Sequence, residues 1–284
     1  MAKVDDILKK LANRHISDYL RWLLPVPVTV VRKLDSELPA ARRGDLVYLL
    51  VTDSGERFVF HLEFQQDRST APMNLRMLGY DVRLREEHRL PVCGEVIYLK
   101  SAADEGFKGQ FIGRCPVREN QAVLTYSYGE TKLWELNGKA LLERQGVGIY
   151  PLLSLTQLDE PIQETLRQMV SEIQKIPDKL LRQDTLFAFK MVGSIMHPMD
   201  FLEAIIRRED YMESPLIQEI YEEGVQEGRL DEKRDVLLML LKVKFGDVPR
   251  SVNTRIQRLR SDKTLNQLLQ KVVTARSLEE LGFK

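Results

Sequence analysis

The chain has 284 residues, of which 43% are hydrophobic and 30% charged, and its 42 basic residues balance 42 acidic ones. This length suggests one large domain or two smaller ones, each able to bury a core. Ordinary numbers of Gly and Pro exclude collagen-like and wholly disordered chains, and no apolar run is long enough to predict a membrane span. Two cysteines and a first segment without an apolar run lead us to expect a reduced, cytoplasmic protein without a membrane partner.

The first third of the chain combines helical and strand patterns. Apolar residues recur at helical spacing over residues 4–24, and Pro25 ends the pattern, which predicts one or two short amphipathic helices. Residues 46–51 and 57–65 are rich in β-branched, Leu and aromatic residues, and the segment between them has a turn composition. We therefore predict a β-hairpin.

A helix and three more strands are predicted to follow the hairpin. The helix covers about residues 72–87, with an apolar stripe made of Leu75, Leu78 and Val82. Residues 92–99 are mostly apolar and predict a buried central strand, and shorter strands are expected at 122–128 and 132–136. This order favours an α/β fold with a small mixed sheet flanked by helices.

The rest of the chain is predicted to be helical almost throughout, from residue 161 to the end. The charged stretch 221–231 contains two glycines and is our candidate linker or hinge. We therefore predict a core over residues 1–160, a helical extension over 161–223 and a basic helical module over 224–284. The last part holds 13 basic and 8 acidic residues, which could supply phosphate contacts or simply form a solvated surface.

Alternation along the second hairpin strand separates two sets of side chains. One face carries Phe58, Phe60, Leu62 and Phe64, which we expect in the core, and the other carries His61, Glu63 and Gln65. If the hairpin loop consists of residues 53–55, the register places Asp45 opposite Glu63; a loop one residue shorter or longer shifts the register.

Two facing carboxylates repel each other, and a divalent cation would relieve the repulsion. Oxygen ligands of this kind suit Mg²⁺ or Mn²⁺, which can activate water for attack on a phosphodiester. Charged residues on a strand are also common without any metal, so this pattern alone leaves both interpretations open. His61 shares the acidic face, but with only four histidines in the chain a hydrogen-bonded structural role is favoured over zinc binding.

Three short segments resemble a known nuclease family in order and spacing. They are residues 44–47 (Gly-Asp-Leu-Val), 61–65 (His-Leu-Glu-Phe-Gln) and 76–80 (Arg-Met-Leu-Gly-Tyr). They resemble the recombination-promoting nuclease/putative transposase (Rpn, YhgA-like) family of the PD-(D/E)XK nuclease superfamily. The resemblance covers about residues 20–160. It implies a restriction-endonuclease-like sheet, and the tail is similar to a helical domain of unknown function often appended to these nucleases.

The resemblance also implies the site residues. Asp45 and Glu63 would hold Mg²⁺ or Mn²⁺, and Glu37 resembles an acidic residue that some members supply from the preceding helix. Gln65 stands where the superfamily has Lys, and an amide can orient water or phosphate but cannot carry a proton as Lys does. Members of the family resemble one another in this Gln, so the substitution does not by itself imply an inactive enzyme.

On the predicted helix, Arg76 and Tyr80 lie four residues apart on a polar stripe that continues to Arg83 and Glu87. Arg76 and Tyr80 could hold a DNA phosphate beside the metal, or the stripe could form surface ion pairs such as Arg83 with Glu87.

Two functions of different classes follow from these patterns. The first is a Mg²⁺-dependent DNA endonuclease with Asp45, Glu63 and Gln65 as its catalytic residues, for which a homodimer would provide one site for each strand of a duplex. The second is a catalytically inactive DNA-binding or assembly protein on the same scaffold, favoured by Gln65 and by the overall neutrality of the chain.

Overall fold

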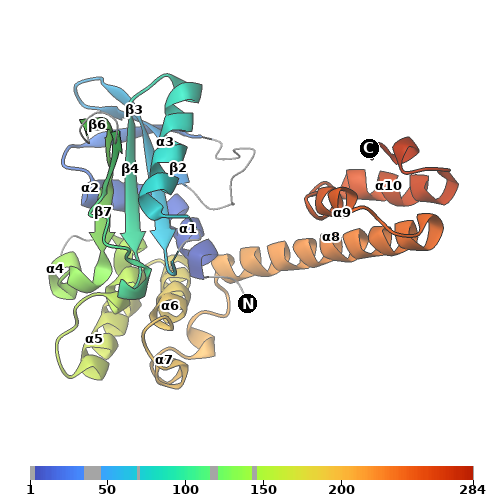
Figure 1. The fold of residues 1–284 in the computed structure, drawn as a ribbon. Helices are drawn as coiled ribbons and strands as arrows, with labels where there is room; N and C mark the ends of the chain where they lie inside the picture. The colour runs from blue at the N-terminus through green and yellow to red at the C-terminus, as the bar shows by residue number, and fades with distance from the viewer. Residues whose placement is uncertain (1–3, 35–45, 69–70, 116–120, 143–145, 284) are drawn as a thin grey trace. The chain divides into compact units, whose positions relative to one another are not determined.

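The computed structural model describes residues 4–34, 46–68, 71–115, 121–142 and 146–283. The chain forms two compact units, Met1–Ile217 and Gln218–Lys284 (Figure 1). Residues 1–160 and nearly all of the predicted extension 161–223 fall in the first unit. The predicted basic module 224–284 falls in the second unit. Within the described residues, no helix has both the length and the apolar character needed to cross a membrane.

The first unit is built on a mixed sheet of five strands in the order β1-β2-β3-β4-β7. The strands are β1 (Val28–Lys33), β2 (Leu46–Thr52), β3 (Arg57–Gln65), β4 (Val92–Tyr98) and β7 (Gly129–Lys132). The first three pair antiparallel, whereas β3–β4 and β4–β7 pair parallel. A separate hairpin consists of β5 (Gln110–Cys115) and β6 (Gln121–Ser127). The α/β fold with a mixed, helix-flanked sheet and a helical C-terminal region is thus confirmed.

The hairpin of β2 and β3 has the three-residue loop that its sequence allowed. The amide of Thr52 donates to the carbonyl oxygen of Glu56, and Leu46 pairs with Leu62. Gly55 adopts a φ of 89°, a left-handed conformation that glycine takes without steric strain. The predicted register is therefore confirmed up to Leu46, and Asp45, the next residue back, lies outside the described residues together with Glu37.

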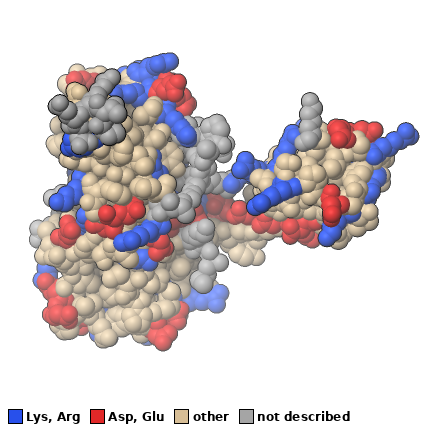
Figure 2. All heavy atoms as spheres, in the orientation of Figure 1, with Lys and Arg blue, Asp and Glu red and all other residues tan. Residues whose placement is uncertain are grey.

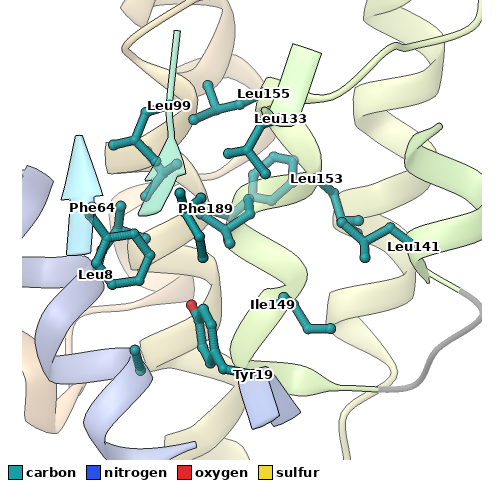
Figure 3. Close-up of a cluster of buried hydrophobic side chains, with 14 of the residues drawn as sticks. Leu8, Tyr19, Phe64, Leu99, Leu133, Leu141, Ile149, Leu153, Leu155 and Phe189 are labelled. Carbon is teal, nitrogen blue, oxygen red and sulfur yellow. The ribbon is translucent and has the colours of Figure 1, made fainter. Parts of the chain in front are cut away.

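One face of the sheet packs on the main hydrophobic core. Phe60, Leu62 and Phe64 point into this core, as predicted, and meet helices α1 (Val4–Arg14) and α2 (Ile16–Leu23) and the 3-10 helix η4 (Val147–Leu155). Figure 3 shows Phe64 beside Leu8, with Tyr19, Ile149 and Phe189 in the same cluster. The core thus joins segments that are more than 100 residues apart in the sequence.

The remaining helices of the first unit differ in length, from single 3-10 turns to a helix of 16 residues. They are α3 (Met73–His88), η1 (Ser101–Ala103), η3 (Leu133–Glu135), α4 (Gly138–Leu142), α5 (Ile162–Gln174), α6 (Lys179–Gly193), α7 (Met199–Ile205) and η5 (Arg208–Asp210). The strand expected at 132–136 is wrong, because the chain turns into η3 after Lys132. Leu133 and Leu136 are three residues apart, the spacing that aligns side chains in a 3-10 helix, and both contact the core.

The apolar stripe predicted for the helix at 72–87, which is α3, is also wrong. In α3, Leu75 and Val82 are exposed, whereas Met77 and Leu84 face the sheet. The helix is instead rotated so that its charged side chains Arg76 and Asp81 meet buried polar side chains of β3.

The second unit is helical. It contains most of α8 (Pro215–Phe245), then α9 (Arg250–Gln257), α10 (Asp262–Thr274) and η6 (Glu279–Leu281), and its core is formed by Leu237, Leu241, Val252, Ile256, Leu265, Val272 and Phe283. The stretch 221–231, predicted as a linker or hinge, is helical and lies within α8, shortly after the boundary between the two units. Gly224 and Gly228 each weaken a helix by about 1 kcal/mol, which the surrounding Glu, Gln, Arg and Leu residues tolerate. Residues 221–229 are all exposed.

Asp184 of α6 is a buried anchor in the first unit. One carboxylate oxygen accepts hydrogen bonds from the Ser214 hydroxyl at 2.6 Å and from the Leu216 amide at 3.0 Å. The other oxygen pairs with Arg14 of α1. This single carboxylate therefore ties α1 and the start of α8 to α6.

We expect Asp184→Ala to lower the free energy of unfolding of the first unit by about 3 kcal/mol, because buried donors lose a charged acceptor. Asp184→Asn, which keeps an acceptor oxygen, should lose less. Both tryptophans, Trp22 and Trp134, lie in the first unit, so fluorescence during urea unfolding measures this unit. Exposed Asp6→Ala is the control, and an equal effect of the Asp6 and Asp184 changes would contradict the anchoring role.

Candidate functional site: a buried polar layer between β3 and α3

Three polar side chains lie buried on the face of β3 that is turned away from the main core. His61, Glu63 and Gln65 are 0%, 1% and 7% exposed. Strand alternation places them together, and α3 packs over β3 and β4 on this side (Figure 1). A buried charge or amide is costly without a hydrogen-bond or ion-pair partner. The side chains of α3 that face these three residues therefore decide their chemistry.

Arg76 of α3 supplies the partner for two of these groups. Its Nη2 lies 2.6 Å from Oε2 and 2.8 Å from Oε1 of Glu63, and its Nη1 donates to Oε1 of Gln65 at 3.3 Å. The Arg76 guanidinium also lies 5.8 Å from the centre of the Tyr80 ring, within range of a cation–π contact. The sequence left two roles open for Arg76, phosphate contact or a surface ion pair. The structure shows an ion pair with the buried carboxylate of Glu63.

The third polar group, His61, belongs to a separate chain of hydrogen bonds. Its Nδ1 lies 3.0 Å from Oδ1 of Asp81 on α3, and the Tyr126 hydroxyl of β6 donates to Oδ2 of the same carboxylate at 2.5 Å. The His61 ring also packs edge-on against Tyr80, with ring centres 5.4 Å apart. Burial, together with the Asp81 charge, raises the pKa of Tyr126, so this hydroxyl acts as a donor. His61 is thus the hydrogen-bonded structural histidine expected.

We refer to His61, Glu63, Gln65, Arg76 and Asp81 as the buried polar layer. Its space depends on a glycine of the neighbouring strand. A Cβ atom at Gly94 of β4 would lie 2.7 Å from Oδ2 of Asp81 and 2.8 Å from Cε of Met77. Gly94 therefore leaves the volume that the Asp81 carboxylate fills.

The structure brings together four of the predicted site residues. Glu63, Gln65, Arg76 and Tyr80 lie in or against the buried polar layer, and Asp45 and Glu37 lie outside the described residues. Farther along α3, Arg83 and Glu87 are exposed and do not join the layer.

Sequence reasoning missed Asp81 and Tyr126. Asp81 falls four residues after Met77 and three before Leu84, so it continues the buried face of α3. A polar residue at that spacing on an otherwise apolar face was the available signal. Tyr126 carried no such signal, because it reaches the layer from a hairpin outside the main sheet.

The donor types in the layer fit a hard divalent cation. Among the described residues, no three His, Cys, Asp or Glu side chains gather closely enough to hold a metal ion. Glu63 and Gln65 nevertheless supply a carboxylate and an amide oxygen, and Mg²⁺ commonly binds through one or two carboxylates while keeping several waters. A cation bound by Glu63 would share that carboxylate with the Arg76 guanidinium.

Glu95 of β4 is a partly buried carboxyl in the same sheet. Thr131 of β7 donates a hydrogen bond to it at 2.8 Å, and a Cβ atom at Gly129 would collide with it. Burial raises the pKa of Glu95 to about 7, despite the opposing hydrogen bond from Thr131. Glu95 therefore titrates near neutral pH in the folded chain.

Comparisons of the chain with protein-family models, with curated proteins and with solved structures find no match.

We expect Gly94→Ala to destabilise the first unit by about 1–3 kcal/mol, because the added methyl group overlaps Asp81 and Met77. Gly79→Ala is the matched control: Gly79 lies exposed in α3 with no atom near its Cβ position, so alanine there should stabilise the helix by about 1 kcal/mol. Urea unfolding followed by tryptophan fluorescence measures both. Equal effects of the two changes would contradict the crowding at Gly94.

The raised pKa of Glu95 predicts a pH dependence of stability. Its protonated form is favoured by folding, so its contribution is complete below its ordinary pKa of 4.5 and is lost as the pH rises through about 7. Between about pH 5 and pH 8 the loss should approach 3 kcal/mol. Glu95→Gln should remove this part of the dependence and be the more stable protein at about pH 8; identical pH profiles of the two proteins in urea unfolding would contradict the assignment.

Proposed function

We propose that the protein is a metal-dependent DNA endonuclease that hydrolyses phosphodiester bonds at the buried polar layer. The observation that carries this proposal is the placement of Glu63 and Gln65 on one face of β3, against Arg76 of α3. The register of β2 with β3 supports it, because Leu46 pairs with Leu62 and Asp45 directly precedes Leu46 in the sequence. The order of motifs that resembles the Rpn family points the same way.

In this proposal Glu63 and Asp45 hold Mg²⁺ or Mn²⁺, with Glu37 as a further acidic candidate. The bound cation would stabilise negative charge on the phosphate and make water a better nucleophile. The Gln65 amide orients water or a phosphate oxygen by hydrogen bonds, since it cannot transfer a proton. Arg76, held against Glu63, can turn part of its fork of donors toward a phosphate, and Tyr80 supports the guanidinium from the side.

A second candidate is a catalytically inactive protein that binds DNA or assembles with partners on the same scaffold. The Arg76–Glu63 ion pair favours it, because the guanidinium contacts both carboxylate oxygens and so already neutralises the proposed metal ligand. Homodimer formation and a cytoplasmic location stay predictions under either function.

Plasmid nicking separates the two candidates. We expect the wild-type chain to nick supercoiled DNA with Mg²⁺ or Mn²⁺ and not with EDTA. Glu63→Gln should slow nicking by about 100-fold or more, the scale for losing one charged group at a reacting centre. The control is Glu86→Gln, an exposed residue of α3, which should cleave as the wild type does.

Circular dichroism establishes that each variant is folded. Nicking by Glu63→Gln at the wild-type rate would contradict the site. Folded wild-type protein that binds DNA but cleaves with neither metal would favour the inactive scaffold.

A further inference from the structure

The second unit contains a pocket of about 290 Å³ that the proposed nuclease site does not use. It is lined by Gln226, Arg229, Leu230, Arg260 and Asp262. The first three come from consecutive turns of α8, Arg260 comes from the connection between α9 and α10, and Asp262 is the first residue of α10. The volume is close to the lower end of small-ligand pockets, which leaves room for a phosphate group with part of its sugar.

The pocket is held in shape by a buried arginine next to it. Arg234 of α8 is 6% exposed, and its Nε donates to the carbonyl oxygen of Leu259 at 2.8 Å. Its guanidinium also pairs with Asp231 one turn earlier on α8. Because Leu259 is the residue before Arg260, this contact fixes the start of the α9–α10 connection against α8 and keeps the two walls of the pocket together.

The charge in the pocket is positive. Arg229 and Arg260 are exposed and make no ion pair within the part of the chain that the structure describes. The one acidic lining residue, Asp262, already has partners within the unit, since Lys233 pairs with its Oδ1 at 2.5 Å and Asn266 donates to its Oδ2 at 2.9 Å. The hydrogen bond from Lys233 lowers the pKa of Asp262, so this carboxylate stays ionised.

Further positive groups continue beyond the pocket. Arg258 and Lys263, both exposed, lie within two residues of Arg260 and Asp262 along the chain. Helix α10 begins at Asp262, so the positive end of its dipole lies at the same place. Figure 2 shows Lys and Arg side chains at both ends of the second unit. A row of cations fits a chain of phosphates better than a single small anion.

We propose that this pocket binds a backbone phosphate of nucleic acid. Arg229 and Arg260 would donate hydrogen bonds to the phosphate oxygens from opposite walls. The Gln226 amide would add a neutral donor, and Leu230 would contact the sugar. Arg258 and Lys263 would meet the neighbouring phosphates. This site is separate from Glu63, and binding to it requires neither a metal nor cleavage.

The test is fluorescence anisotropy with a labelled DNA oligonucleotide, single-stranded and duplex, using the full-length chain in EDTA. The Arg229→Gln/Arg260→Gln double variant should bind at least about tenfold more weakly, and its salt dependence should be shallower by about one phosphate contact. Arg250→Gln is the matched control, because Arg250 is exposed at the start of α9 outside the pocket, and it should bind as the wild type does.

A gain of function makes the test independent of losses through misfolding. Asp262→Asn removes the negative charge from the lining and keeps a polar group at the start of α10, so it should tighten binding several-fold. Equal affinities of the double variant and Arg250→Gln would overturn the proposal. It would also be overturned if inorganic phosphate or a mononucleotide bound the wild type as tightly as the oligonucleotide does, which would assign the pocket to a small phosphate ligand. The anisotropy measurement in EDTA requires neither a metal nor cleavage, so failure of the endonuclease proposal gives a different result from failure of this one.

Discussion

The need to neutralise buried charge between β3 and α3 constrains the first unit more than any other interaction. A carboxylate as deeply buried as Glu63 is tolerated only beside a close cation, and Arg76 provides it. Asp81 is held by hydrogen bonds with His61 and Tyr126 instead of by an arginine. These contacts fix the rotation of α3 about its axis, even though Leu75 and Val82 then face water.

Stability alone gives little reason to keep such a layer. Replacing a buried ion pair by well-packed apolar residues is often neutral or stabilising, whereas removing one partner is strongly destabilising. A sheet face that carries His61, Glu63 and Gln65, with Gly94 leaving room for Asp81, is therefore arranged around polar chemistry more than around packing.

The sequence predicted much of the sheet and part of the site, for physical reasons. Strand alternation and a loop with Gly55 determine which side chains share a face, so the phenylalanine face and the register followed from local patterns. Contacts between distant segments did not follow. The pairing of Arg76 with Glu63 and the approach of Tyr126 to Asp81 depend on how α3 and the β5–β6 hairpin pack, and local periodicity does not encode that. Gly224 and Gly228 of α8 suggested a break in the helix, but their helix-forming neighbours outweigh the low helix propensity of glycine.

The exposed stretch 221–229 of α8 affects how the chain responds to heat and denaturant. Nine successive helical residues without buried side chains, two of them glycine, give almost no cooperative stabilisation, since most helical stability in proteins comes from packing. Loss of structure in one unit is then transmitted only weakly through this stretch to the other. The chain should consequently be treated as two folding units with separate free energies, and a single melting temperature would average two different equilibria.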